Sequence, residues 1–175
     1  NNNLWINSLL RVFYLESIIN NLKISSFVHF DLDVLIYKPF KELEQLLNIK
    51  KINITRLTDS EIIFSYSFVP NIEIYNKFCK LFYEKIVYKY KNEEKMEINE
   101  MELISMIEKD NPQLFNILPS LPYDSNGIIF DPATYGQYFG GTHDKPRKFY
   151  QPKRSQIHHI VGTEINSKRI KPKIK

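Results

Sequence analysis

Two aspartates one residue apart directly follow a short apolar run, and this arrangement constrains the chain more than any other feature. The run is Phe-Val-His-Phe at 27–30, and the acids are Asp31 and Asp33. Such a run predicts a strand, in which residues i and i+2 lie on the same side. Both carboxylates can therefore point into one site, where hard oxygen ligands suit Mg²⁺ or Mn²⁺ together with phosphate oxygens and water.

An ordinary turn is the alternative interpretation of the same residues. Asp is common where a strand gives way to a loop, so Asp31 could end the strand and Asp33 could cap the turn before Pro39. A second apolar run follows at 34–37, and we therefore expect both acids at the edge of a core. Burying them there without partners would be costly, which favours a ligand site.

Length and composition predict a single globular domain. The chain has 175 residues, of which 43% are hydrophobic and 14% aromatic, enough to bury a core. Its formal charge of +4 is mild, and much of the excess lies after residue 144. This excess indicates either an anionic ligand at that end or a solvated basic tail, and it does not suggest a nucleic-acid partner.

Targeting signals and disulfides are not indicated by the sequence. A single cysteine, Cys79, cannot form an intrachain disulfide, and we place it in the core. We see no membrane-spanning run and no signal peptide, which favours a cytoplasmic location. The sequence opens at Asn1 without a Met, and we interpret it as a fragment or a processed product.

Apolar periodicity predicts an α/β chain. We expect helices over 4–22, 39–47, 74–90 and 99–109, and a brief one from 131 that stops at Gly140. We expect strands over 27–30, 51–55, 61–69, 114–118 and 127–130.

Further candidate site residues lie in three later segments. Glu100 opens a helix after the expected cap Asn99, where it either presents a carboxylate to a bound polyol or serves as a capping acid. The segment 131–141 offers an acid, stacking rings, an amide and glycines that allow close backbone approach, or else it is a packed helix with a glycine stop. Its candidates are Asp131, Tyr135, Gln137, Tyr138, Gly140 and Gly141.

The basic end of the chain holds the remaining candidates. His159 could complete a metal sphere begun by the two aspartates, and Lys145 and Arg147 could neutralise a diphosphate. A surface histidine and a solvated basic face are the alternatives. Lys168 and Lys171 belong to the same basic set.

Taken in order, these motifs resemble those of glycosyltransferases with the GT-A fold. Asp31-Leu-Asp33 stands where that family has its Asp-X-Asp. Glu100-Met101 and Leu118-Pro119 are similar to the Asp-Gln and Leu-Pro of its glycogenin-like branch, with Glu-Met replacing Asp-Gln. His159-Ile-Val-Gly162 and Lys171-Pro172 are similar to its late His-X-X-Gly and Lys-Pro, at a longer separation. The segment 129–141 also resembles a signature in glycosyltransferase-like proteins of large DNA viruses and some microbes.

The resemblance implies a hexosyltransferase-like enzyme with a mixed sheet flanked by helices. Residues 1–150 would be its catalytic part, without the N-terminal nucleotide-binding strands, and 151–175 a basic segment holding the third metal ligand. It would transfer a sugar from a nucleoside diphosphate donor, in particular a UDP-sugar, to a hydroxyl of a carbohydrate, protein or lipid. The order of motifs favours retention of configuration.

The same resemblance assigns roles to the candidates. Mn²⁺ or Mg²⁺ would be held by Asp31, Asp33 and His159, with Glu100 and Asp131 near the reacting sugar. We expect weak UDP binding unless an upstream segment or a partner completes the nucleotide site.

Two other classes stay open. A haloacid-dehalogenase-type phosphohydrolase also begins with a strand ending in Asp-X-Asp, the first acid being the nucleophile. That family has Gly and then Thr or Val after the second Asp, whereas Val34-Leu35 follows here. The third class is a non-catalytic carbohydrate-binding relative of the GT-A fold.

Overall fold

One mixed sheet of four strands organises the described part of the chain. The computed structural model describes residues 3–32, 34–92, 98–120 and 127–132, and the account that follows is confined to them. The strands are β1 (Phe27–Phe30), β2 (Ile52–Thr58), β3 (Glu61–Val69) and β4 (Phe115–Leu118), in the spatial order β1-β3-β2-β4. β3 runs antiparallel to both β1 and β2, and β4 is parallel to β2. β1 and β4 are therefore the two edge strands.

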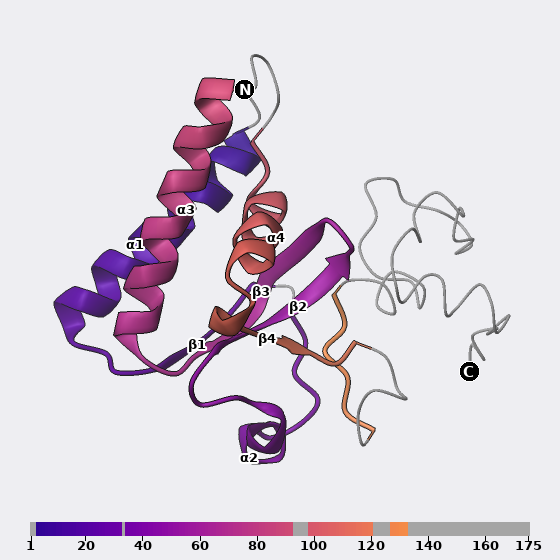
Figure 1. Ribbon diagram of the computed structural model, residues 1–175. Helices are drawn as coiled ribbons and strands as arrows, with labels where there is room; N and C mark the ends of the chain where they lie inside the picture. The colour runs from indigo at the N-terminus through magenta and orange to yellow at the C-terminus, as the bar shows by residue number, and fades with distance from the viewer. Residues whose placement is uncertain (1–2, 33, 93–97, 121–126, 133–175) are drawn as a thin grey trace, which may run out of the picture.

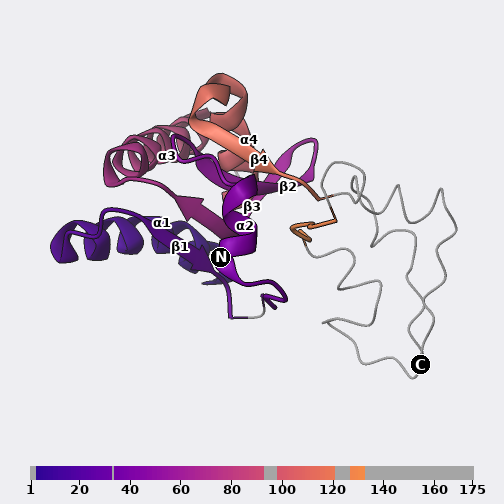
Figure 2. The same ribbon diagram turned by 90° about the horizontal axis from the view of Figure 1, so that it is seen from below.

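Helices lie on both faces of this sheet (Figures 1 and 2). The longer ones, α1 (Asn3–Leu22), α3 (Ile72–Asn92) and α4 (Glu100–Asp110), share one face. The short α2 (Phe40–Leu43) and the 3-10 turn Glu44–Leu46 cover the other, and a second 3-10 turn, Pro112–Leu114, leads into β4. This confirms the expected α/β class.

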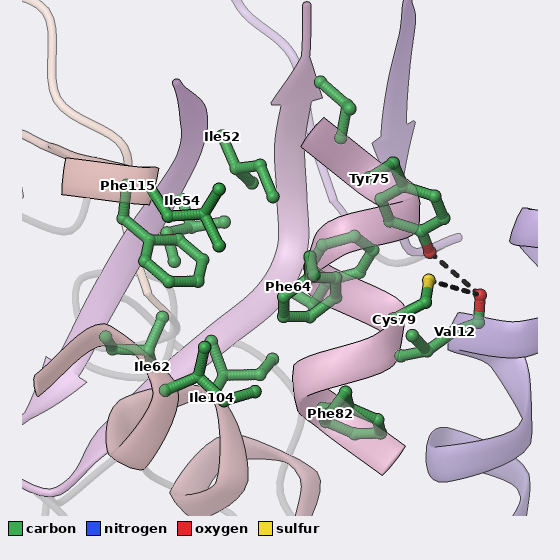
Figure 3. Packing of buried hydrophobic residues seen from close by; sticks show 14 of the residues in the cluster. Val12, Ile52, Ile54, Ile62, Phe64, Tyr75, Cys79, Phe82, Ile104 and Phe115 are labelled. Carbon is green, nitrogen blue, oxygen red and sulfur yellow. Dashed lines mark hydrogen bonds between the residues drawn. The ribbon is translucent and has the colours of Figure 1, made fainter. Parts of the chain in front are cut away.

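The larger core lies between the three long helices and the sheet. Phe64 of β3 stacks against Tyr75 and Phe78 of α3, with ring centroids 6.3 and 6.0 Å apart. Figure 3 shows Tyr75 and Cys79 pointing toward the Val12 carbonyl, to which their Oη and Sγ donate at 3.0 and 3.9 Å. Cys79 is buried in this core, as predicted.

Strand alternation separates this core from a smaller one on the α2 face. In β1, Phe27 packs into the helix-side core whereas Val28 packs into the smaller one. The smaller core is built from Leu43, Tyr66, Leu118 and Phe130. By the same alternation, His29 and Asp31 belong to the helix side of the sheet.

Four of the five predicted helices and four of the five predicted strands are confirmed within a few residues of their expected bounds. Asn99 caps α4 as expected, because its side chain accepts a hydrogen bond of 2.9 Å from the Met101 amide. The helix expected from residue 131 lies outside the described residues beyond Pro132. In the described part of the chain, no helix is long and apolar enough to span a membrane.

Two predictions were wrong. Residues 127–130 form no strand; a 2.8 Å hydrogen bond from the Phe130 amide to the Pro119 carbonyl holds this segment against the second core instead. The run at 34–37 does not border a core either, since Leu35 and Tyr37 are 73% and 85% exposed. The cause is a turn directly after β1, in which the Val34 amide donates to the Asp31 carbonyl at 3.0 Å.

Candidate functional site

Arg11 joins two acids that are far apart in the sequence. From α1 its Nη1 contacts Oδ1 of Asp31, directly after β1. Its Nη2 donates to both carboxylate oxygens of Glu100, at 2.9 and 3.0 Å, at the start of α4. Three elements therefore meet at a single guanidinium, whose planar set of donors is suited to binding carboxylates.

The backbone fixes Asp31 in this position. Its amide donates to the Ser65 carbonyl at 2.8 Å, which continues the β1–β3 ladder by one residue, and its carbonyl accepts from Val34 in the turn. Its side chain remains 31% exposed. Asp31 thus directly follows the strand and presents a partly accessible carboxylate.

Glu100 is much more deeply buried. Its side chain is only 4% exposed, and it sits in the first turn of α4, where the helix dipole favours a negative charge. Burial raises the pKa of Glu100; the Arg11 guanidinium opposes that rise, and the neighbouring Asp31 charge adds to it. Without Arg11, the ionised form of Glu100 would be costly in this place.

The pKa of Asp31 is shifted in the opposite direction from that of Glu100. Burial pushes its pKa upward, but the neighbouring His29 imidazole and the Arg11 guanidinium outweigh that effect, so the pKa of Asp31 lies below its usual value. His29 Nε2 lies 3.5 Å from Asp31 Oδ1, and its ring stacks on Phe64 with centroids 5.2 Å apart. Asp31 therefore stays ionised while Glu100 has a greater tendency to take up a proton.

Several buried polar atoms around this group lack a hydrogen-bond partner among the described residues. They are Arg11 Nε and Ser67 Oγ, together with Ser105 Oγ on α4. His29 and Ser67 are register partners on neighbouring strands, both on the helix side of the sheet. Buried polar atoms are usually satisfied in folded proteins, so this polar region has spare capacity for water or a ligand.

The chemistry of a divalent cation fits Asp31 in part. A partly exposed, ionised carboxylate is a suitable hard ligand, and each of the contacts described above uses Oδ1. Within the described residues, no group of three acid, histidine or cysteine side chains could hold a metal. Asp33 and His159, the other two predicted ligands, lie outside the described residues.

The remaining predicted residues are not brought to this site by the described part of the chain. Asp131 is exposed and follows Phe130, which packs in the smaller core on the opposite face of the sheet from α1 and α4. The other candidates, namely Tyr135, Gln137, Tyr138, Gly140, Gly141, Lys145 and Arg147, lie outside the described residues.

Sequence reasoning missed Arg11, although a signal was present. Arg11 and Glu16 are the only charged residues in the 20-residue α1. Charged side chains in so apolar a helix usually have fixed partners, because burial without them is costly. The identity of those partners depends on the tertiary structure.

No family of known proteins, no curated protein and no solved structure matches this chain.

Proposed function

We propose that this chain is the catalytic part of a metal-dependent glycosyltransferase of the GT-A type. It would transfer a sugar from a nucleoside diphosphate donor, in particular a UDP-sugar, to a hydroxyl acceptor. One observation carries the proposal: Arg11 holds Asp31 and Glu100 together. These acids come from two separate motifs of the resemblance, and their meeting in space supports a common site.

The described residues suggest a division of roles. Arg11 holds Asp31 through Oδ1 and would leave Oδ2 of that carboxylate available to a cation. Glu100 is 4% exposed and both of its carboxylate oxygens accept from Arg11, so it would act by positioning Arg11 beside Asp31. Asp31, with Asp33 and His159, would hold the cation, which when bound would stabilise the leaving diphosphate. Lys145 and Arg147 remain candidates for additional phosphate contacts, and Asp131 for a sugar contact.

The phosphohydrolase alternative fits this geometry less well. In that class, the first aspartate attacks phosphorus and must be a free nucleophile. Here Asp31 is paired with Arg11 and also lies near His29, and both contacts draw on the same oxygen. A carboxylate stabilised in this way has lower basicity and is a weaker nucleophile.

Calorimetric titration of UDP with and without Mn²⁺ tests the proposal. We expect the metal to strengthen UDP binding in the wild type, and Asp31→Asn or Asp33→Asn to remove most of that increment while the fold is retained. Glu108→Gln is the matched control, since Glu108 pairs with Arg56 at 2.7 Å elsewhere. UDP binding that is indifferent to Mn²⁺, or a metal effect that survives both Asp substitutions, would refute the assignment.

A further inference from the structure

The strand β3 is irregular opposite the middle of β2. Asn53 of β2 pairs with Phe68 of β3, and Thr55 pairs with Ile63. One residue of β2 therefore lies between these pairs, against the four residues 64–67 of β3, so that β3 has an excess of three and forms a bulge. Side chains alternate along a strand, and an odd excess exchanges the two faces across the bulge.

The packing of β3 shows this exchange. Ile62 and Phe64 lie in the larger core on the helix side of the sheet (Figure 3), whereas Tyr66 packs in the smaller core on the other side. In a regular strand Phe64 and Tyr66, which are two residues apart, would lie on the same face. Val69, three residues after Tyr66, is again in the larger core. The alternation of β3 is therefore reversed between Phe64 and Tyr66.

This reversal decides the face of the sheet on which Asp31 lies. β1 pairs in regular register with residues 66–69, which follow the reversed alternation. His29 and Asp31 therefore project to the helix side. If β3 continued the alternation of Phe64 without a bulge, both side chains would project toward α2, away from Arg11. The contact between Asp31 and Arg11 thus depends on the bulge.

Asn53 lies at the edge of the bulge and binds it through a fully buried side chain. Its Nδ2 donates to the Phe68 carbonyl at 3.3 Å. The same nitrogen donates to the carbonyls of Asn48 and Lys51, at 2.9 and 2.8 Å. Its Oδ1 accepts from the Asn48 amide at 2.7 Å and from Nδ2 of Asn116 at 2.8 Å. One side-chain amide therefore joins β2, β3, β4 and the loop before β2.

We propose that Asn53 is a positioning residue for the candidate site, because it holds the β3 bulge in place and thereby keeps Asp31 on the side of Arg11. A slip that removed the bulge would move the Phe68 carbonyl away and leave polar atoms of Asn53 buried without partners, which is costly. A satisfied buried polar group can in this way select one register over another. The inference rests on the proposed function only for the role of Asp31.

A purely structural role for Asn53 is the alternative. Asn53 would then do no more than fix the loop 48–51 against β2. Its loss would lower the stability of the protein but leave folded molecules unchanged at His29, on the other side of the sheet. Asn53 projects to the α2 side, since its neighbours Ile52 and Ile54 pack in the helix-side core. A change at His29 on substitution of Asn53 must therefore be transmitted by β3.

Nuclear magnetic resonance of the folded protein tests the proposal. The rings of His29 and Phe64 stack with centroids 5.2 Å apart, so the wild type should show a nuclear Overhauser contact between them. Asn53→Ala should lose most of this contact while remaining folded, because the two rings would no longer share a face. The exchange rate of the Asp31 amide should also rise about tenfold or more relative to that of the Phe82 amide in α3.

Asn71→Ala is the matched control. It removes the same kind of side chain at the start of α3, where Asn71 Oδ1 accepts from the Ile74 amide at 2.9 Å. It should lower stability but keep the ring contact and the relative exchange rate of the Asp31 amide. If Asn53→Ala does not fold, Asn53→Thr, which has a similar volume and one hydroxyl, takes its place with the same expectation.

Three outcomes would overturn the proposal: a wild type without the ring contact, a folded Asn53 variant that keeps it, or an equal loss in Asn71→Ala. Neither measurement involves UDP or a metal. Failure of this proposal is therefore distinguishable from failure of the proposed function, which the calorimetric titration tests.

Discussion

Replacing Arg11 should destabilise the protein far more at neutral pH than in acid. In Arg11→Met the aliphatic stem is largely preserved, while the guanidinium between Asp31 and Glu100 is lost. Removing one partner of a buried ion pair typically costs about 3–5 kcal/mol, because the remaining charge is left uncompensated. Glu100, 4% exposed, accounts for most of this cost, whereas Asp31 is nearly one-third exposed and water screens its charge.

The pH dependence follows from the two pKa shifts. The pKa of Glu100 is raised in the folded protein, so its contribution to stability is fully present in acid and declines as pH rises through that raised value. Removing Arg11 raises the pKa of Glu100 further and extends this decline to higher pH. The pKa of Asp31 is lowered, and the stability this confers above its unfolded value also shrinks without Arg11. Both changes make the Arg11→Met variant least stable, relative to the wild type, at neutral and alkaline pH.

Urea unfolding of the wild type and of Arg11→Met at pH 5 and pH 8 measures this difference. The double variant Arg11→Met/Glu100→Met should recover to within about 1 kcal/mol of the wild type, since apolar residues of similar size often replace a buried ion pair without loss. Lys38→Met, which breaks an exposed ion pair with Glu42 whose side chains are 51% and 48% exposed, is the control and should cost less than about 1 kcal/mol. An equal loss at both pH values, or a double variant as unstable as Arg11→Met, would refute this account of Arg11.

Three further outcomes are expected from the described contacts. Asn99→Ala should destabilise the protein by about 1 kcal/mol in urea unfolding, because the Met101 amide loses its cap; an unchanged midpoint would contradict this. Phe64→Ala should cost about 3–5 kcal/mol at a site 1% exposed, and equal losses for Phe64→Ala and the half-exposed Phe30→Ala would argue against the core described here. Cys79 is buried and burial raises its pKa, so a thiol reagent should label it only at the rate at which the protein opens; rapid labelling in native buffer would be inconsistent with that burial.

The regular elements of the fold could be predicted because their apolar spacing is a local property. In the long helices apolar residues recur every three to four positions, which fits a helix. In 61–69 apolar and polar residues alternate, which fits a strand. The run at 127–130 is too short for such a pattern, and its Phe130 is held by a contact with Pro119 and the second core rather than by strand pairing. A short apolar run alone could not distinguish these outcomes.

The candidate site could be predicted only in part. Asp31 and Glu100 were identifiable from their local positions, at the end of a strand and the start of a helix. That they share Arg11 depends on how α1 and α4 pack over β1, which no local pattern encodes. The exposure of Leu35 and Tyr37 was missed for a related reason, since the turn at Asp31 redirects a segment whose composition resembles that of a core strand.

α1 carries large apolar side chains on its solvent side as well as on the side that packs into the core. Its charged residues, Arg11 and Glu16, face the protein, whereas a ridge of large apolar side chains faces solvent. Inward charge is stable only where fixed partners exist, and Asp31 and Glu100 provide them for Arg11. An outward apolar ridge gains stability only if another surface covers it. Because Arg11 and Tyr14 are three residues apart, they are neighbours on the surface of α1, and substitutions at the two positions should act non-additively on stability.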